Sequence, residues 1–309
     1  MLRQHYHCAL AACFAVGGMV LATQESEAAP RYRVVDVSVT AGFDTKALAW
    51  GVNNHNDVVG VFKTPLGKNH AFVWLYEDRF NGLLPWTFYD LTDLAQLPDS
   101  NAFGNTAYAI NDDGVIVGAH LTQEDGTTRA FLWDLREYYP GAQPSEWTLD
   151  IGSLCPDGWS EARDISNATP PYISGTTATD NAPGPSCSGR LAFRAEFIGL
   201  TPPTLTTLSP VPDGDDSSAG RRLNDFAVVT GRSSPGGITI SCSTAPDSVA
   251  WTSAVQELPG VPRTPTSQIG GYAHDVNNAN QVIGYGQEDD STQADCNDRA
   301  LFWEQAVSG

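Results

Sequence analysis

Apolar and polar residues alternate in short segments along most of the chain, and clusters of Asn, Asp, Gly and Pro separate these segments. The segments are rich in β-branched and aromatic residues, a composition typical of strands. No window shows the sustained 3.6-residue periodicity of an amphipathic helix. The pattern therefore predicts an all-β chain.

One nine-residue string, a polar turn between two β-rich arms, recurs with small changes. It is VNNHNDVVG at 52–60, INDDGVIVG at 110–118, LNDFAVVTG at 223–231 and VNNANQVIG at 276–284. A fifth, more divergent copy lies third in the chain and ends at Gly175. The glycines that close the five copies recur at intervals of roughly 55 residues, a period that indicates an array of supersecondary units. These glycines are Gly60, Gly118, Gly175, Gly231 and Gly284.

Each unit contains four segments of strand length, which predicts twenty strands in five groups. The first segments are 32–37, 87–92, 147–152, 204–209 and 254–259. The second precedes the polar turn, the third ends near the closing glycine, and the fourth carries aromatic residues, as in 70–74 and 129–133. Repeated four-stranded units are typical of a β-propeller. We expect a five-bladed propeller of antiparallel blades, each taking three segments from one unit and the first segment of the next. The N-terminal strand at 32–37 would then complete the last blade and close the ring.

The repeated string A-x-x-I-N-x-x-G-x-V-V-G is followed by His-Ala-Phe-x-Trp, seen at His70–Trp74. This combination resembles the HAF-type bacterial extracellular repeat, and the resemblance covers essentially all of residues 29–309. The third copy departs from it in its turn, and the fourth has Asp-Ser-Val in place of His-Ala-Phe. The resemblance implies export and a propeller-like fold, and it implies no activity.

The N-terminal residues have the pattern of a secretory signal peptide. Arg3 precedes an apolar run at 8–22, and small residues surround Ala28, where we expect cleavage. The remaining domain, 29–309, has no further apolar run, so no membrane span is expected. We expect the protein in the bacterial periplasm or outside the cell.

Export places the remaining cysteines, Cys155, Cys187, Cys242 and Cys296, in an oxidising compartment, where an even number suggests two disulfides. Of the three possible pairings we favour Cys155–Cys187 and Cys242–Cys296. Zinc is the weaker interpretation, because no CxxC or HxxxH spacing is present.

The charge balance excludes one class of partner. The chain has 17 Lys and Arg against 36 Asp and Glu, a formal net charge of −19, and no basic run that would bind nucleic acid. The acidic loops 123–125, 213–216 and 288–290 are candidates for Ca²⁺, although solvated loops are the stronger interpretation. No other metal and no cofactor is expected. The Asn/Asp turns are assigned to hairpin formation, and the recurring aromatics to the core.

The second strand of each unit carries small residues suited to a crowded axis, with one position that differs between copies. We predict that these residues bind a polar ligand near the channel, although polar contacts between blades are a somewhat stronger interpretation. The residues are Trp50, Tyr108, Arg163, Arg221 and His274.

Three functions remain open. The leading hypothesis is a monomeric exported binding module for a polysaccharide, a cell-surface component or a protein. The second is a glycoside hydrolase with Asp164 and Asp275 as its carboxylates, whose pKa values the flanking arginines would lower. The third is a structural envelope protein. No catalytic motif is present, so an enzyme is the less favoured class.

Overall fold

The computed structural model describes residues 34–37, 46–99, 104–122, 126–180, 187, 189–212, 216–234, 246–259, 271–288 and 297–304. The chain divides into two compact units, Met1–Asp36 and Val37–Gly309. Every helix and strand below belongs to the second unit. None of the helices in the described ranges has the length and hydropathy of a membrane span.

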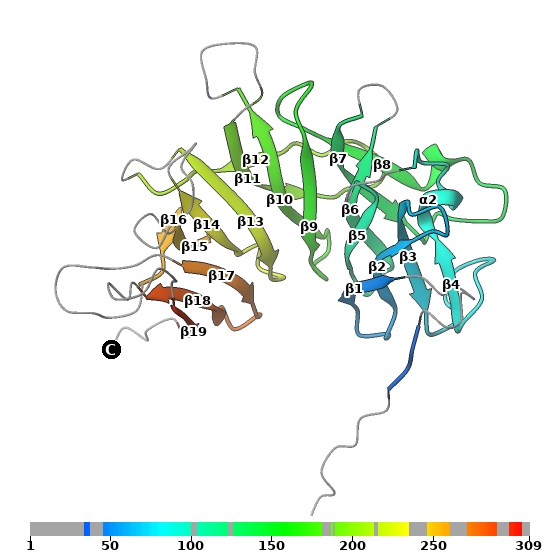
Figure 1. Cartoon of the computed structure of the whole chain (residues 1–309), viewed down its shortest axis with the longest axis horizontal. Helices are drawn as coiled ribbons and strands as arrows, with labels where there is room; N and C mark the ends of the chain where they lie inside the picture. Colours follow the sequence, from blue (N-terminus) through cyan, green and yellow to red (C-terminus); the bar gives the residue numbers. More distant parts are fainter. Residues whose placement is uncertain are drawn as a thin grey trace, which may run out of the picture. The chain divides into compact units, whose positions relative to one another are not determined.

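The all-β prediction is confirmed, because the second unit contains five separate antiparallel sheets (Figure 1). Sheet A contains β1 (Ala47–Val52), β2 (Val58–Lys63), β3 (Asn69–Leu75) and β4 (Thr87–Asp90). Sheet B contains β5 (Thr106–Ile110), β6 (Val115–Leu121), β7 (Thr128–Asp134) and β8 (Thr148–Gly152). Sheet C contains β9 (Ser160–Ile165), β10 (Tyr172–Thr179), β11 (Gly189–Glu196) and β12 (Thr206–Leu208). Sheet D contains β13 (Ser217–Leu223), β14 (Val229–Ser234), β15 (Asp247–Trp251) and β16 (Val255–Glu257). Sheet E contains β17 (Gly271–Val276), β18 (Val282–Glu288) and β19 (Asn297–Trp303).

The strands of each sheet follow chain order, so sheets A to D combine three segments of one repeat with the first segment of the next, as predicted. Sheet E has three strands among the described residues. The predicted closing strand at 32–37 is not part of it: residues 34–37 form no strand, and residues 32–33 lie outside the described ranges.

In the part of the chain that the structure describes, two short helices interrupt the all-β pattern. The predicted strand 87–92 ends at Asp90, because its carboxylate accepts hydrogen bonds from the backbone N–H groups of Thr92 and Asp93. This N-cap begins the one-turn helix α2 (Leu91–Leu94). A 3₁₀ turn, η2 (Pro144–Glu146), precedes β8.

A β-bulge explains why every hairpin closes with glycine. In each sheet the strand that precedes the polar turn carries one extra residue opposite the strand that follows the turn, next to the closing glycine. The strands with the extra residue are β1, β5, β9, β13 and β17, and we call each of them the first strand of its sheet. A Cβ on Gly60 would lie 2.0 Å from the carbonyl oxygen of Leu48, and a Cβ on Gly118 would lie 1.9 Å from that of Thr106. The other three closing glycines have equally close carbonyls, at 2.1, 2.0 and 1.9 Å. Only glycine therefore allows the two backbones to approach at the bulge.

The first strand of each sheet packs against the sheet that precedes it in the chain. Strand β5 contacts β1, β2 and β3; β9 contacts β5, β6 and β7; β13 contacts β9, β10 and β11; β17 contacts β13, β14 and β15. Apolar clusters fill these junctions. The predicted aromatic core is confirmed for Phe72, Trp74, Phe131, Trp133, Phe193 and Trp251, which are buried. Phe302 of the last sheet is exposed, in contrast to the prediction.

The polar hairpin turns also link neighbouring sheets, a role that the sequence did not indicate. The backbone N–H of a turn residue in one copy donates to the side chain of the corresponding residue in the next copy. The pairs are Asn54 to Asp112 (2.9 Å), Asp112 to Asn167 (2.8 Å), Asn167 to Asp225 (2.7 Å) and Asp225 to Asn278 (3.0 Å). We call this series the Asx relay. It runs in one direction through all five copies.

Candidate functional site

All five predicted ligand-binding residues occupy the same structural position: each is the extra residue of its β-bulge. The register of the first strand skips Trp50, Tyr108, Arg163, Arg221 and His274. A bulge takes its residue out of the regular alternation of the strand and re-aims the side chain. The position that varies between copies is therefore the position that has no partner in the strand pairing.

These five side chains form a connected series along the first strands. The Trp50 and Tyr108 rings lie edge to face, with their centroids 6.2 Å apart. The Arg163 guanidinium lies over the Tyr108 ring at 4.2 Å. Burial and the positive charge of Arg221 lower the pKa of His274. The structure thus brings Trp50, Tyr108 and Arg163 into contact and places Arg163 and Arg221 in the lining of one pocket.

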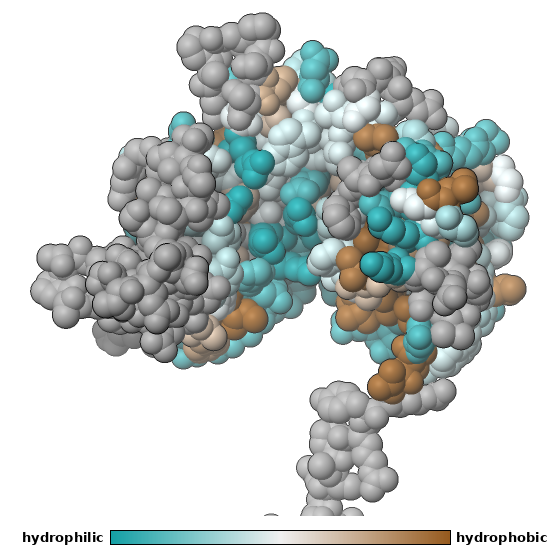
Figure 2. All heavy atoms as spheres, in the orientation of Figure 1, coloured by the Kyte–Doolittle hydropathy of each residue, from teal (hydrophilic) through white to brown (hydrophobic). Residues whose placement is uncertain are grey.

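Two members of the series, Arg163 and Arg221, line a pocket between sheets C and D that contains four arginines. Strand β9 supplies Arg163, β11 supplies Arg190, β13 supplies Arg221 and β14 supplies Arg232. Trp159, Glu161, Thr176, Ala219, Gly220 and Tyr272 complete the lining. Figure 2 shows hydrophilic side chains gathered over this part of the molecule, where β9 and β13 lie side by side.

Aromatic faces and one carboxylate hold three of the four guanidinium groups. Arg190 lies over Trp159 at 4.7 Å, and Arg232 lies over the Tyr272 ring at 5.1 Å and donates to its hydroxyl at 2.6 Å. Arg163 forms an ion pair with Glu161 at 2.7 Å. Such contacts fix the guanidinium orientation while leaving N–H groups available to a ligand.

The pocket has an excess of positive charge. Glu161 is the one acidic residue in its described lining. Desolvation, followed by the charges of neighbouring arginines, lowers the pKa of both Arg190 and Arg221. Arg221 makes no hydrogen bond or ion pair with any residue in the described ranges. Arginines that repel one another in a partly buried pocket are stabilised when an anion binds between them.

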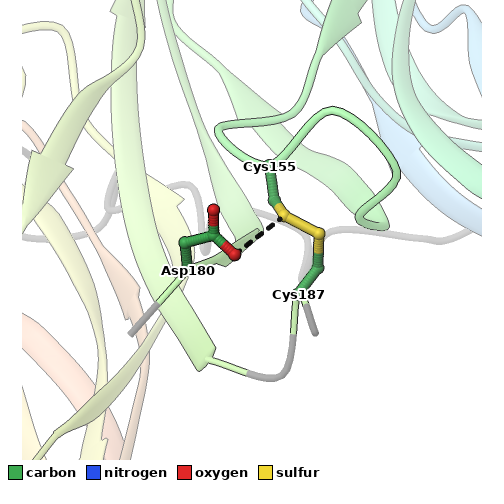
Figure 3. Close-up of side chains that lie close together, drawn as sticks. All are labelled: Cys155, Asp180 and Cys187. Carbon is green, nitrogen blue, oxygen red and sulfur yellow. Dashed lines mark hydrogen bonds between the residues drawn. A yellow bond between two sulfur atoms is a disulfide. The ribbon is translucent and has the colours of Figure 1, made fainter. Parts of the chain in front are cut away.

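The predicted disulfide Cys155–Cys187 is confirmed, with its Cα atoms 5.8 Å apart (Figure 3). Cys155 precedes Trp159 in the β8–β9 loop, and Cys187 precedes Arg190 at the start of β11. The disulfide therefore joins the two segments that carry the stacked Trp159–Arg190 pair. An oxygen of Asp180 lies 3.7 Å from the sulfur of Cys155. Cys242 and Cys296 lie outside the described residues. The acidic loops proposed for Ca²⁺ also lie outside them, except for Asp216 and Glu288.

The sequence indicated Arg163 and Arg221 but missed Arg190, Arg232, Trp159 and Tyr272. These four lie on other strands or loops, and only the packing of sheets C, D and E brings them to the same pocket. One available signal was the concentration of arginine: six of the chain's 17 basic residues lie between Arg163 and Arg232.

Asp164 and Asp275, the carboxylates of the enzyme hypothesis, differ from expectation. Asp164 accepts hydrogen bonds from Arg222 at 3.2 Å and from the backbone N–H of Leu223 at 2.9 Å, so it links sheet C to sheet D. The predicted lowering of its pKa by arginine is wrong: desolvation outweighs Arg222 and raises the pKa of Asp164 to about 6. The Asp275 carboxylate accepts a hydrogen bond from the backbone N–H of Val276.

A second polar cluster lies on sheet A, around the histidine of the His-Ala-Phe string. The Nδ1 atom of His70 lies 2.7 Å from Asp90, and its Nε2 atom lies 3.1 Å from Asp99. Burial disfavours the charged imidazole, but the surrounding carboxylates, including Asp93, outweigh burial and raise the pKa of His70. The donor set His70, Asp90 and Asp93 has the atoms that a metal requires. Both ring nitrogens, however, already face carboxylates, which is the arrangement of a protonated histidine.

Comparisons with known proteins leave the site to be interpreted from its own geometry. No protein-family model matches the chain. No relative among curated proteins matches it either.

Proposed function

We propose that this chain is an exported β-propeller of the HAF-repeat type that binds an anionic ligand at the four-arginine pocket. The observation that carries the proposal is the gathering of Arg163, Arg190, Arg221 and Arg232 in one pocket of a chain with a formal net charge of −19. Elsewhere such an acidic surface repels anions. The pocket, with four arginines and one carboxylate in its described lining, therefore has a charge opposite in sign to the net charge of the molecule.

Guanidinium chemistry narrows the class of ligand. The planar fork of arginine matches the oxygens of carboxylate, sulfate and phosphate groups, and bidentate pairs of this kind are strong and directional. Neither Arg190 nor Arg221 forms an ion pair with a described residue, so they are the groups that we assign to direct contact. The stacked Trp159 and the hydroxyl of Tyr272 position their arginine neighbours for the same anion.

Export and the bulge series favour a polymeric ligand. The series from Trp50 to His274 extends beyond the pocket itself and offers aromatic and polar contacts on either side of it. An acidic polysaccharide, which repeats its carboxylate or sulfate groups along a chain, fits both features. We propose this class as the ligand.

The test is calorimetric titration of the mature protein with a polyuronate, a sulfated glycan and a neutral glucan of similar length. We expect the two acidic polymers to bind and the glucan not to bind. Arg221→Ala and Arg190→Ala should each weaken binding by about tenfold, the loss expected for a charge-assisted hydrogen-bonded contact.

The matched control is Lys63→Ala, which removes one positive charge from an exposed position on sheet A. Its affinity should stay within about twofold of wild type, since surface charges far from a site act only through a screened field. Equal losses in all three variants would contradict the pocket and indicate a general charge effect. Equal binding of the neutral glucan would contradict the anionic ligand.

A further inference from the structure

The two ends of the series of sheets expose apolar residues whose counterparts at the junctions of sheet A with B and of sheet B with C are buried. Val52 on β1 is 66% exposed, whereas Ile110, the same position in the next repeat, is 6% exposed. On the last sheet, Ile283 and Phe302 are 52% and 59% exposed, whereas their counterparts Val59 and Val73 in sheet A are fully buried. Leu48 of β1 is also exposed, and hydrophobic atoms reach the surface over this strand (Figure 2).

The internal junctions show what covers each of these faces. Ile110 of β5 belongs to the same apolar cluster as Val59 and Val73 of the preceding sheet. Ile165 of β9 packs in the same way with Val117 and Leu132. Val52 occupies in β1 the position that Ile110 occupies in β5, and Ile283 and Phe302 occupy in sheet E the positions of Val59 and Val73 in sheet A. The face of β1 therefore has the residues needed to pack against the outer face of sheet E.

The Asx relay has complementary free groups at the same two ends. The backbone N–H of Asn278 makes no hydrogen bond with any residue in the described ranges, although its counterpart on Asp225 donates to the following copy. The Oδ1 atom of Asn54 accepts no hydrogen bond from these residues, although the corresponding oxygen of Asp112 accepts one from the preceding copy. A donor remains on the last turn and an acceptor on the first.

A second layer of bonds has the same polarity. The side-chain amide of Asn53 donates to the carbonyl of Asn111, and that of Asn224 donates to the carbonyl of Asn277. The side-chain amide of Asn53 also donates one hydrogen bond within its own turn, to Asp57. The side-chain amide of Asn277 donates in the same way to Gln281, so its second N–H can donate to the next copy. The next copy after the fifth, in this direction, is the first.

From these three matched features we infer that the face of β1 and the outer face of sheet E bind one another within one chain. The fifth junction then has Val52 against Ile283 and Phe302, Asn278 N–H donating to Asn54 Oδ1, and the Asn277 amide donating to the Asn53 carbonyl. Closure in this form uses the inner strands and the turns, and it does not require the N-terminal strand that the sequence suggested.

The inference deepens the proposed binding site, because the two strands at this junction carry Trp50 and His274. Closure places the first and last members of the bulge series next to each other and makes the series continuous around the axis. It rests on the proposed propeller scaffold but not on the ligand, so it is tested without one.

The experiment compares the thermal stability of three variants that each introduce one aspartate. In a closed ring, Val52→Asp buries a charge, so its melting temperature should fall by several degrees, as it does for Ile110→Asp at an internal junction. Leu66→Asp, at a position that is 84% exposed, is the control for the added charge. A Val52→Asp melting temperature equal to that of the Leu66→Asp control would overturn the inference. If Val52→Asp does not yield folded protein, the milder polar variants Val52→Thr and Ile110→Thr give the same comparison.

Sedimentation analysis separates closure within one chain from pairing between two copies. We expect a monomer whose melting temperature does not depend on protein concentration. A dimer or larger assembly that Val52→Asp dissociates would mean that a second copy covers the faces, and would overturn closure within the chain. A double-mutant cycle of Val52→Asp and Ile283→Lys should show a favourable coupling energy if the two side chains face each other. Failure of all acidic polymers to bind would leave these results unchanged and would contradict only the proposed function.

Discussion

Asp164 shows how a residue that suggests chemistry in the sequence becomes a structural link in the fold. Its side chain is 14% exposed and spans the junction between sheets C and D through Arg222 and the backbone of Leu223. Burial disfavours its ionised form more strongly than these partners favour it. The carboxylate therefore links the sheets at a cost to stability at neutral pH.

We predict that Asp164→Asn removes a pH-dependent component of stability. The pKa of Asp164 rises from 3.8 to about 6 on folding, so the folded state holds a proton that the unfolded state releases. Its contribution is complete below about pH 4 and is lost as the pH rises to about 6, by roughly 3 kcal/mol. Denaturant titrations of both proteins between pH 4 and pH 7 should show wild type losing unfolding free energy relative to the variant. Parallel curves would contradict the burial of this charge.

At the scale of elements, the Cys155–Cys187 disulfide positions one wall of the arginine pocket. It ties the β8–β9 loop, which carries Trp159, to the start of β11, which carries Arg190. The stacked side chains of Trp159 and Arg190 lie on segments that this disulfide joins. A loop-borne site on a sheet scaffold commonly needs such a constraint.

The double variant Cys155→Ala/Cys187→Ala should therefore lose both stability and affinity. We expect a loss of about 2–4 kcal/mol in unfolding free energy, typical of a native disulfide, together with weaker binding of the acidic polymer. In an Arg190→Ala background the same change should weaken binding much less, because the positioned group is already absent. Equal losses of affinity in both backgrounds would mean that the disulfide acts elsewhere.

The strand pattern could be predicted because it is local, and the pocket could not because it depends on packing. Alternating residues and glycine-closed turns located all nineteen described strands. The positions of Trp50 and Arg221 followed from the repeat, since the copies differ there. Arg232 and Tyr272 lie on different sheets and have no shared motif, so only the contact between β14 and β17 joins them. The direction of the Asp164 pKa shift also depended on burial, which the sequence does not contain.

At the scale of the whole molecule, charge is distributed unevenly rather than balanced. The formal net charge is −19, yet the third and fourth repeats gather six arginines, four of which line the pocket. An acidic polymer would approach against a repulsive field and bind within an attractive one. Both fields are screened by salt, but contacts inside a partly buried pocket are screened less.

We predict that affinity for the acidic polymer falls between 50 and 200 mM NaCl by about threefold to tenfold, since several arginine–anion contacts are involved. Arg221→Ala should show a smaller salt dependence, because one contact is missing. Calorimetric titrations of both proteins at the two salt concentrations measure the difference. A salt-independent affinity would exclude arginine–anion contacts as the source of binding.

The β-bulge that each first strand carries beside its closing glycine has a further consequence for how the protein diversifies. The glycine and the Asx turn maintain the backbone, while the bulge residue takes no part in the register. A bulge residue is therefore less constrained by strand pairing than its neighbours, and the present set contains an indole, a phenol, two guanidiniums and an imidazole. Variation at these five positions allows ligand preference to evolve while the strand pairing stays constant. A library restricted to these codons should consequently contain many folded members with altered selectivity.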